Sequence, residues 1–386
     1  MPTAKIWNGR APEELAAHTG ERRQEPGDPP GSSAGTWKYN RGVHRLPFLL
    51  AYTLFPLHLV SLELRGPWSF LALGYVFAVI PLLDWLSGHS ELESDLRGPR
   101  STFHDRVLEA WLPLQVAVLV WTLHEVSVQP AGPVELLGLA ISLGAISGAG
   151  GITIAHELVH RPGRFHRALA ELLMTCVGYQ HFCIEHVHGH HRRACTPEDP
   201  VSARRGESIY AFFVRAIVLG MRSAWRIEAE RCRRAGVGAL DPRNRRLRYP
   251  ASFLLLVAAV GLLAGPWGLA LFLGQALVAV LLLESADYIE HYGLERRRLP
   301  DGRFERMGPQ HSWNSTHRMT SAFLFHLTRH SDHHFIASRP YDQLRARPDA
   351  PSLPAGYPTM MLLAYLPPLW FRVMDPRAEA ALTLEA

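Results

Sequence analysis

The stretch Ser252–Leu283, "SFLLLVAAVGLLAGPWGLALFLGQALVAVLLL", decides the fold class of this chain of 386 residues. A run of about 20 apolar residues crosses the hydrocarbon core of a bilayer as an α-helix, and this stretch exceeds that length. Gly265 and Pro266 interrupt it near its middle, and both residue types favour turns. We therefore predict two short membrane helices that return the chain to the side from which it came.

Similar apolar blocks occur earlier in the chain, and 47% of all residues are hydrophobic. We expect an all-α polytopic membrane protein with six transmembrane helices. The predicted spans cover approximately 46–64, 67–86, 108–128, 134–155, 251–264 and 267–287. Residues 46–375 form one membrane-embedded domain, between a flexible N-terminal tail (1–45) and a C-terminal tail (376–386). Residues 168–184 are an alternative seventh span, but their polar side chains favour an interfacial or cavity-lining helix.

The distribution of basic residues orients the predicted spans. Lysine and arginine are frequent in 1–45, 97–106 and 192–248, and rare in the connections near Arg65, near Pro130–Pro133 and at Gly265–Pro266. The positive-inside rule then places both termini and the histidine-rich segments in the cytoplasm. We therefore attribute the net charge of +5 to basic loops beside the membrane, and we expect no nucleic-acid partner. The four cysteines form no C-x-x-C pair, so a disulfide framework or a zinc ribbon is not expected.

The chain has 21 histidines, and many fall into four groups. The first group is "HELVH", a pattern also found in zinc proteases, and the others lie in "EHVHGHH", "DYIEHYGL" and "RHSDHH". Spacings of three and four place side chains on one helical face, whereas adjacent histidines point in different directions and can serve two metals. The candidate ligands are His156, His160, His186, His190, His191, His291, His330, His333 and His334.

Nine imidazoles exceed the needs of one metal ion, because a structural zinc takes four ligands and a catalytic zinc three. They fit two ions, although imidazole suits iron, copper and zinc alike. Carboxylates next to these histidines are candidates for orienting them, namely Glu157, Glu185, Glu290 and Asp332. Three further histidines have spacings that leave direct ligation open, namely His181, His188 and His326. Isolated histidines such as His58 are expected to be packed or on the surface.

The motifs "HELVHR", "EHVHGHHRRACTPEDP", "ADYIEHYGLERRR", "PQHSWNSTH" and "LTRHSDHHFIASRPYDQLR" resemble those of the integral-membrane alkane monooxygenases. That family is related to membrane fatty-acid desaturases and xylene monooxygenase. The resemblance extends from about Leu46 to Asp375, and it departs from the usual pattern at Val159 and Asp287. It implies six transmembrane helices and a bacterial inner-membrane location.

The resemblance also implies a non-haem di-iron site held by the nine histidines, with no bound haem, flavin or nicotinamide. The implied reaction is terminal hydroxylation of n-alkanes to 1-alkanols with O2 as co-substrate. The two electrons would come from rubredoxin and an NAD(P)H-dependent rubredoxin reductase. Rubredoxins are acidic, so we expect docking on basic residues, for which the candidates are Arg192, Arg193, Arg204 and Arg205. An equally weighted alternative is that these arginines only follow the positive-inside rule.

A hydrophobic alkane would enter from the membrane lipid into a cavity among the spans, and Val76 is a candidate wall residue. Alternatively, the side chain of Val76 faces lipid.

Other functions remain as alternatives. An enzyme that hydroxylates aryl methyl groups, or a membrane fatty-acid desaturase or hydroxylase, would use similar chemistry. An intramembrane zinc protease would leave seven of the nine histidines unused, and a metal transporter would more naturally place them along a pore.

Overall fold

The computed structural model describes residues 46–90 and 102–383 of the chain. Within these ranges the secondary structure is helical, and β-pairing is confined to isolated bridges. The expected N-terminal tail, 1–45, lies outside the described residues. Of the expected C-terminal tail, residues 376–383 continue helix α17 (Pro367–Thr383), and 384–386 lie outside the described residues.

Five helices in the described part of the chain are long and apolar enough to cross a membrane. Their bounds are Leu46–Leu64, Gly66–Ser87, Thr102–Val128, Pro133–Val159 and Arg245–His291. The first four contain η1 (Leu46–Thr53), α2 (Leu54–Leu64), η2 (Gly66–Phe70), α3 (Leu71–Gly74), η3 (Tyr75–Val79), α4 (Ile80–Ser87), α5 (Thr102–Glu109), α6 (Trp111–Val128), α7 (Pro133–Ala145), η4 (Ile146–Ile152) and α8 (Thr153–Val159). The fifth is α13 (Arg245–His291).

Helix α13 is broken where the sequence predicts a turn. Gly265 has φ 65° and ψ −168°, a conformation outside the helical region. Glycine adopts it without a steric clash of a β-carbon, and the following Pro266 has no backbone N–H to donate to the preceding turn. The long apolar stretch is therefore two helical segments joined at Gly265, as expected.

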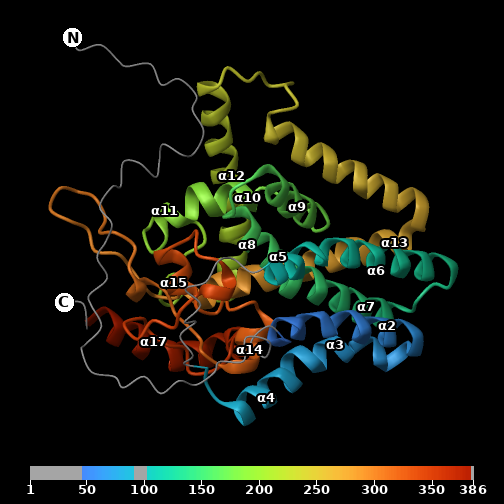
Figure 1. The fold of residues 1–386 in the computed structure, drawn as a ribbon, viewed down its shortest axis with the longest axis horizontal. Coiled ribbons are helices and arrows are strands. Elements are labelled where there is room, and N and C mark those ends of the chain that lie inside the picture. Colours follow the sequence, from blue (N-terminus) through green and yellow to red (C-terminus); the bar gives the residue numbers. More distant parts are fainter. Residues whose placement is uncertain (1–45, 91–101, 384–386) are drawn as a thin grey trace. The chain divides into compact units, whose positions relative to one another are not determined.

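Small residues allow the membrane helices to pack closely. Helix α7 contacts α13, and in Figure 1 the helices α6 and α7 lie beside the second half of α13. A β-carbon at Gly150 would lie 1.8 Å from the buried ring of Trp111, and one at Gly144 would lie 2.5 Å from Val278. Close approach of helix backbones through small residues stabilises membrane bundles. Packing matters there because lipid tails are as apolar as the helix surfaces, so the hydrophobic effect does not drive the helices together.

Polar side chains inside the bundle have partners. The ring of His58 lies 2.9 Å from the hydroxyl oxygen of Ser142 and 2.8 Å from that of Thr122. The hydroxyl of Ser147 lies 2.7 Å from the amide oxygen of Gln275. Such pairs offset the cost of placing polar groups among the spans. His58 therefore has a packing role, as expected for an isolated histidine.

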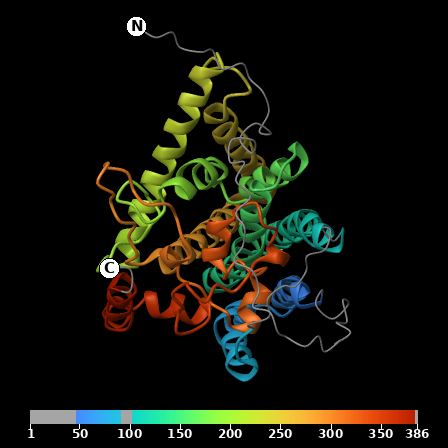
Figure 2. The same ribbon diagram turned by 60° about the vertical axis from the view of Figure 1, so that its left-hand side comes forward.

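The remaining helices follow the fourth membrane helix or α13, and they carry most of the candidate ligands. They are α9 (Arg164–Thr175), α10 (Phe182–Glu185), η5 (His186–His190), α11 (His191–Arg193), α12 (Ile209–Arg234), η6 (Pro309–His311), α14 (Arg318–Phe323), α15 (His330–Phe335), η7 (Tyr341–Gln343) and α16 (Tyr357–Ala364). Residues 168–184 do not form one continuous helix, which agrees with the preference against a seventh span. Figure 2 shows α12 and the start of α13 meeting at one end through residues 235–244.

Asp84 connects the second membrane helix to the segment that precedes α15. Its carboxylate accepts hydrogen bonds from the backbone N–H groups of Met319 (2.8 Å) and Thr320 (3.0 Å) at the start of α14. A carboxylate near the first N–H groups of a helix satisfies donors that have no partner within the helix. This contact holds the C-terminal histidine segment against the membrane helices.

Candidate metal centre

The nine predicted histidine ligands come from four separate segments, and the fold gathers them into two groups. The first group is His156, His160, His186, His191 and His333. The second group is His190, His291, His330 and His334. Within each group, one nitrogen from every ring lies within 4.8 Å of the others. We call these the five-histidine and the four-histidine groups.

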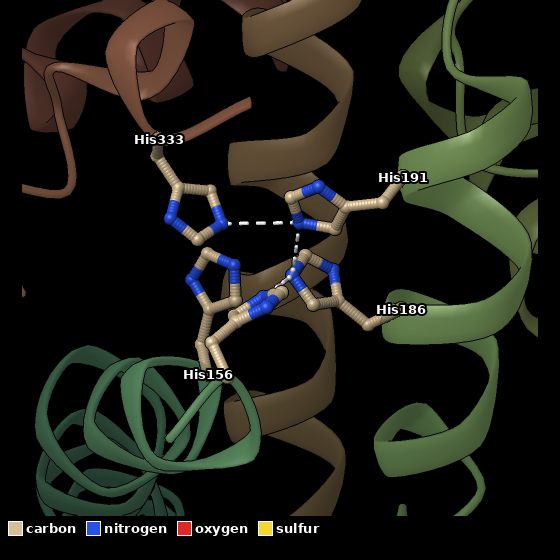
Figure 3. A group of neighbouring side chains, drawn as sticks. His156, His186, His191 and His333 are labelled. Atoms are coloured by element: carbon tan, nitrogen blue, oxygen red, sulfur yellow. Dashed lines mark hydrogen bonds between the residues drawn. The ribbon is translucent and has the colours of Figure 1, made fainter. Parts of the chain in front are cut away.

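The five-histidine group has the spacing of a ligand shell. The Nε2 atom of His186 lies 2.9 Å from that of His160 and 3.0 Å from that of His191, which lies 3.1 Å from that of His333. In Figure 3 the rings of His156, His186, His191 and His333 converge from different helices on a common point. Imidazole nitrogens lie about 2.1 Å from a bound metal, so two at right angles are about 3.0 Å apart. The observed separations fit that geometry.

The four-histidine group has similar spacing. The Nε2 atom of His334 lies 2.9 Å from that of His330 and 3.2 Å from that of His190. The Nδ1 atom of His291 faces the backbone carbonyl of His311 at 3.2 Å, which leaves Nε2 toward the group. His190 and His191 are adjacent in sequence but belong to different groups, as the sequence allowed for a pair serving two metals.

The chemistry of both groups fits bound metal ions. The Nε2 atoms of His156 and His291 are buried and have no hydrogen-bond partner among the described residues. Burial lowers the pKa of most of the remaining rings below the usual value, and the charges of neighbouring histidines lower it further, as for His186, His191, His330, His333 and His334. These rings are therefore neutral, which is the form that binds metal. Unpartnered Nε2 atoms on two rings and the neutral form of five others, all at ligand spacing, indicate a pair of metal sites.

Asp199 orients one ring of the four-histidine group, and sequence reasoning missed it. Its Oδ2 atom lies 2.9 Å from Nδ1 of His190 and accepts a hydrogen bond of 2.6 Å from the hydroxyl of Ser202. Burial disfavours the charged carboxylate, but the interactions with His190 and Ser202 outweigh burial and lower the pKa of Asp199. Asp199 lies nine residues after His190, within a motif already singled out, but only the fold shows this contact.

Among the four predicted orienting carboxylates, Glu290 lies at the four-histidine group. Its Oε2 atom is 3.3 Å from Nε2 of His330, and its Oε1 accepts a hydrogen bond of 3.0 Å from the hydroxyl of Tyr357. The other three carboxylates form ion pairs with arginines. These pairs are Glu157 with Arg161 (2.9 Å), Glu185 with Arg193 (2.7 Å) and Asp332 with Arg339 (2.6 Å).

Three histidines whose role the sequence left open lie outside both groups. His181 packs its ring against Tyr179, with the ring centres 4.3 Å apart. His188 is exposed. His326 packs edge-on against Phe48, with the ring centres 4.7 Å apart.

An apolar cavity of about 80 Å³ borders the five-histidine group. His156 and His186 contribute to its wall, together with Phe182, Phe323 and Leu327. Val76 is 5% exposed and lines the same cavity from the second membrane helix. Asp287 and Glu290 are the acidic residues in this wall. The cavity can hold an apolar chain with one end beside the histidines.

The predicted docking residues have different environments. Arg192, Arg204 and Arg205 are exposed, and Arg205 pairs with Glu379 at 3.0 Å. Arg193 is half-buried and contacts Glu185 and Ser223. Only the first three arginines are therefore accessible to a protein partner along most of their side chains.

Comparisons with known proteins agree with this site. The fatty acid desaturase family profile matches residues 133–363. Alkane 1-monooxygenase 2 of Pseudomonas aeruginosa is 43% identical over 322 residues, which cover 81% of this chain and 85% of that protein. Alkane 1-monooxygenase of Acinetobacter baylyi is 37% identical, over 78% of this chain and 74% of that protein. The xylene/toluene monooxygenase hydroxylase component XylM of Pseudomonas putida is 30% identical, over 70% and 73%. The histidine groups, the apolar cavity and the membrane helices agree with these similarities. The chain therefore belongs to the alkane monooxygenase family of integral-membrane enzymes.

Proposed function

We propose that this protein hydroxylates the terminal methyl group of n-alkanes to 1-alkanols, with O2 as co-substrate and two electrons per turnover. The observation that carries the proposal is the apolar cavity that ends at the five-histidine group. An alkane has no polar group for a protein to recognise, so shape and apolar contact must position it. The related alkane 1-monooxygenases support the substrate class.

We assign two iron ions to the site, one to each histidine group. The nine rings would hold them as five ligands and four ligands. Iron bound there would supply the oxidant for an unactivated C–H bond, which side chains alone do not provide. The fit rests on ligand number and spacing, since imidazole also suits copper and zinc.

The residues of this chain position the substrate and keep water out. Phe182, Phe323 and Leu327 enclose the apolar chain, so that its methyl end lies beside His156 and His186. Asp199 fixes the orientation of the His190 ring through Nδ1, which leaves Nε2 toward the group. The hydroxyl of Tyr357 holds the Glu290 carboxylate at the border between the cavity and the four-histidine group.

We propose six transmembrane spans with both termini and the metal centre on the cytoplasmic side of a bacterial inner membrane. The break at Gly265 supports the sixth span, because it divides α13 into two segments. The concentration of arginine in 192–248 supports the orientation by the positive-inside rule. Residues 46–375 would form one catalytic domain, with α17 extending beyond it.

We propose rubredoxin, reduced by an NAD(P)H-dependent reductase, as the electron donor. His160 and His191 are half-buried, whereas the other rings of the five-histidine group are buried. This edge of the group is the nearest to solvent, which supports electron entry there. The exposed Arg192 and Arg204 are candidates for contact with an acidic donor.

Charge reversal tests this docking surface. The double substitution Arg192→Glu and Arg204→Glu should raise the KM for rubredoxin, and the increase should be larger at low salt because salt screens exposed charges. The control Arg233→Glu changes an exposed arginine on α12 that pairs with Glu230. An equal effect at all ionic strengths would show that the arginines do not steer the donor.

Hydroxylation of aryl methyl groups is the second candidate, because the chain is also similar to XylM. The decisive experiment supplies the iron-loaded protein with rubredoxin, reductase and NADH, and compares n-alkanes, xylene and fatty acids for product. We expect 1-alkanols as the main products. Product from xylene alone would favour the second candidate, and no hydroxylated product from any substrate would exclude both.

Iron content tests the two histidine groups independently of turnover. We expect about two irons per chain, one for each group. His334→Ala removes a buried ring of the four-histidine group and should lower the content toward one. His188→Ala changes an exposed ring outside both groups and should leave the content unchanged. Equal iron loss in both variants would contradict the assignment.

A further inference from the structure

An arginine-rich groove is lined by residues of helices α9, α12 and α13, and none of the nine candidate ligands is among its lining residues. Its volume is about 300 Å³, and its wall contains six arginines. They are Arg164, Arg167, Arg231, Arg243, Arg245 and Arg248. Nothing in the proposed hydroxylation uses this groove, and we call it the arginine groove.

The arginine groove has an excess of positive charge. Glu171 lines it and pairs with Arg248 at 2.7 Å, Glu228 pairs with Arg231 at 2.6 Å, and Asp241 pairs with Arg243 at 2.7 Å. Three carboxylates therefore face six arginines. Among the described residues, no carboxylate lies within ion-pair distance of Arg164 or Arg167, which are both exposed. An anion would be attracted to the groove.

Two helices begin at the groove and contact each other. The hydroxyl of Tyr249 on α13 donates a hydrogen bond of 2.7 Å to Glu171 on α9, and Gln180, which follows α9, donates one of 2.8 Å to Ser252 on α13. Arg164 is the first residue of α9, and Arg245 is the first residue of α13. No side chain caps the start of α9, so its first N–H groups add to the attraction for an anion, whereas at α13 the N–H groups of Arg245 and Arg246 already donate to Glu228 and Asn244.

The spacing of arginines and leucines along α13 matches a groove at the depth of lipid headgroups. Leu254 and Leu255 of α13 are 65% and 72% exposed, as expected of side chains that face acyl chains. Arg248 precedes Leu254 by six residues, which is about 9 Å along a helix. The headgroup layer on each side of a bilayer is roughly 5–8 Å thick. The guanidinium groups of the arginine groove therefore lie beside lipid phosphates when the leucines lie in the hydrocarbon.

We propose that the arginine groove binds the phosphate of an anionic phospholipid. Guanidinium groups form paired hydrogen bonds with phosphate oxygens, which fits this ligand. Exposed apolar side chains further along the same helices, such as Leu172 and Leu254, would contact its acyl chains. These apolar neighbours favour a lipid over an acidic protein, whose surface would meet them with polar groups. The lipid would hold α9 beside the first half of α13.

Lipid titration of the full-length protein in detergent tests the proposal. The probes are dioleoylphosphatidylglycerol, dioleoylphosphatidylcholine and inorganic phosphate, and bound lipid is counted by native mass spectrometry. Each arginine contributes about fivefold in affinity for an anionic lipid surface. Arg164→Gln with Arg167→Gln should therefore weaken phosphatidylglycerol binding roughly 25-fold. Because both side chains are exposed, helix content and iron content should match those of the unmodified protein.

The matched control is Arg233→Gln with Arg234→Gln, which removes the same charge from exposed side chains that pair with Glu230. It should leave phosphatidylglycerol binding unchanged. Equal loss in both double variants, or equal binding of phosphatidylcholine, would overturn the proposal. Displacement of the lipid by inorganic phosphate at equal concentration would identify a free-anion site instead. Intact lipid binding with a raised KM for rubredoxin in the Arg164/Arg167 variant would assign the groove to the electron donor.

Discussion

Replacing Val76 by tryptophan should shorten the n-alkane that this protein prefers. Val76 lies in the π-turn η3 of the second membrane helix and lines the cavity of about 80 Å³. A water-sized group needs roughly 10–15 Å³ of such space, so the cavity holds about six methylene-sized groups. An indole ring in place of the isopropyl group would fill most of that space, because tryptophan has the largest side chain.

The size of the effect follows from apolar transfer. Each methylene that loses its place in the cavity costs about 0.8 kcal/mol, which is roughly fourfold in kcat/KM. Displacing three methylenes would therefore lower kcat/KM for the longer alkanes about 60-fold. Alkanes that are shorter by about this length should keep most of their rate, because their contacts beside His156 and His186 are unchanged.

The assay is a competition among n-alkanes from hexane to hexadecane in one reaction, with the 1-alkanols separated by gas chromatography. The product ratio then reports relative kcat/KM and does not depend on electron supply or enzyme concentration. Val79→Trp is the matched control, because Val79 lies on the same helix and is 41% exposed. An unchanged product distribution in folded, iron-loaded Val76→Trp would refute the cavity assignment, and so would an equal shift in Val79→Trp.

Two further predictions concern the support of the site. Asp199→Asn removes the negative charge from the partner of a ligand ring and should weaken iron binding about 10–100-fold, as measured by iron titration. Asp301→Asn, at an exposed pair with Arg303, should leave binding unchanged, and the same loss there would contradict an orienting role. Gly150→Ala forces a β-carbon against a buried ring and should lower stability by about 1–3 kcal/mol in thermal unfolding. Gly74→Ala, with open space at its β-carbon, should cause no such loss, and equal melting of both variants would argue against close packing at Gly150.

The membrane architecture could be predicted from the sequence to a large extent. Apolar runs long enough to cross a bilayer are a local property, and five helices meet that condition. The turn at Gly265 was also predictable, because glycine and proline restrict the backbone at their own positions. The helix ends were less certain, and the fourth membrane helix continues to Val159.

The division of the ligands was not predictable, because it depends on the course of the backbone through η5. The four-residue spacing of His186 and His190 suggests one face of an α-helix, but they belong to different groups. His186 instead lies with His191, five residues later, as the wider turn of a π-helix favours. The spacing in the sequence therefore identified the candidate ligands, but not which of them belong to the same histidine group.

The sequence by itself determined that the chain is a membrane protein and which nine histidines are candidate metal ligands, since both follow from residue type and local spacing. Only the tertiary structure brought His156, His191 and His333 within one group. It also revealed Asp199 beside His190 and placed Val76 in the cavity wall. These contacts join segments on different helices, and their relative positions depend on how all of the helices pack together.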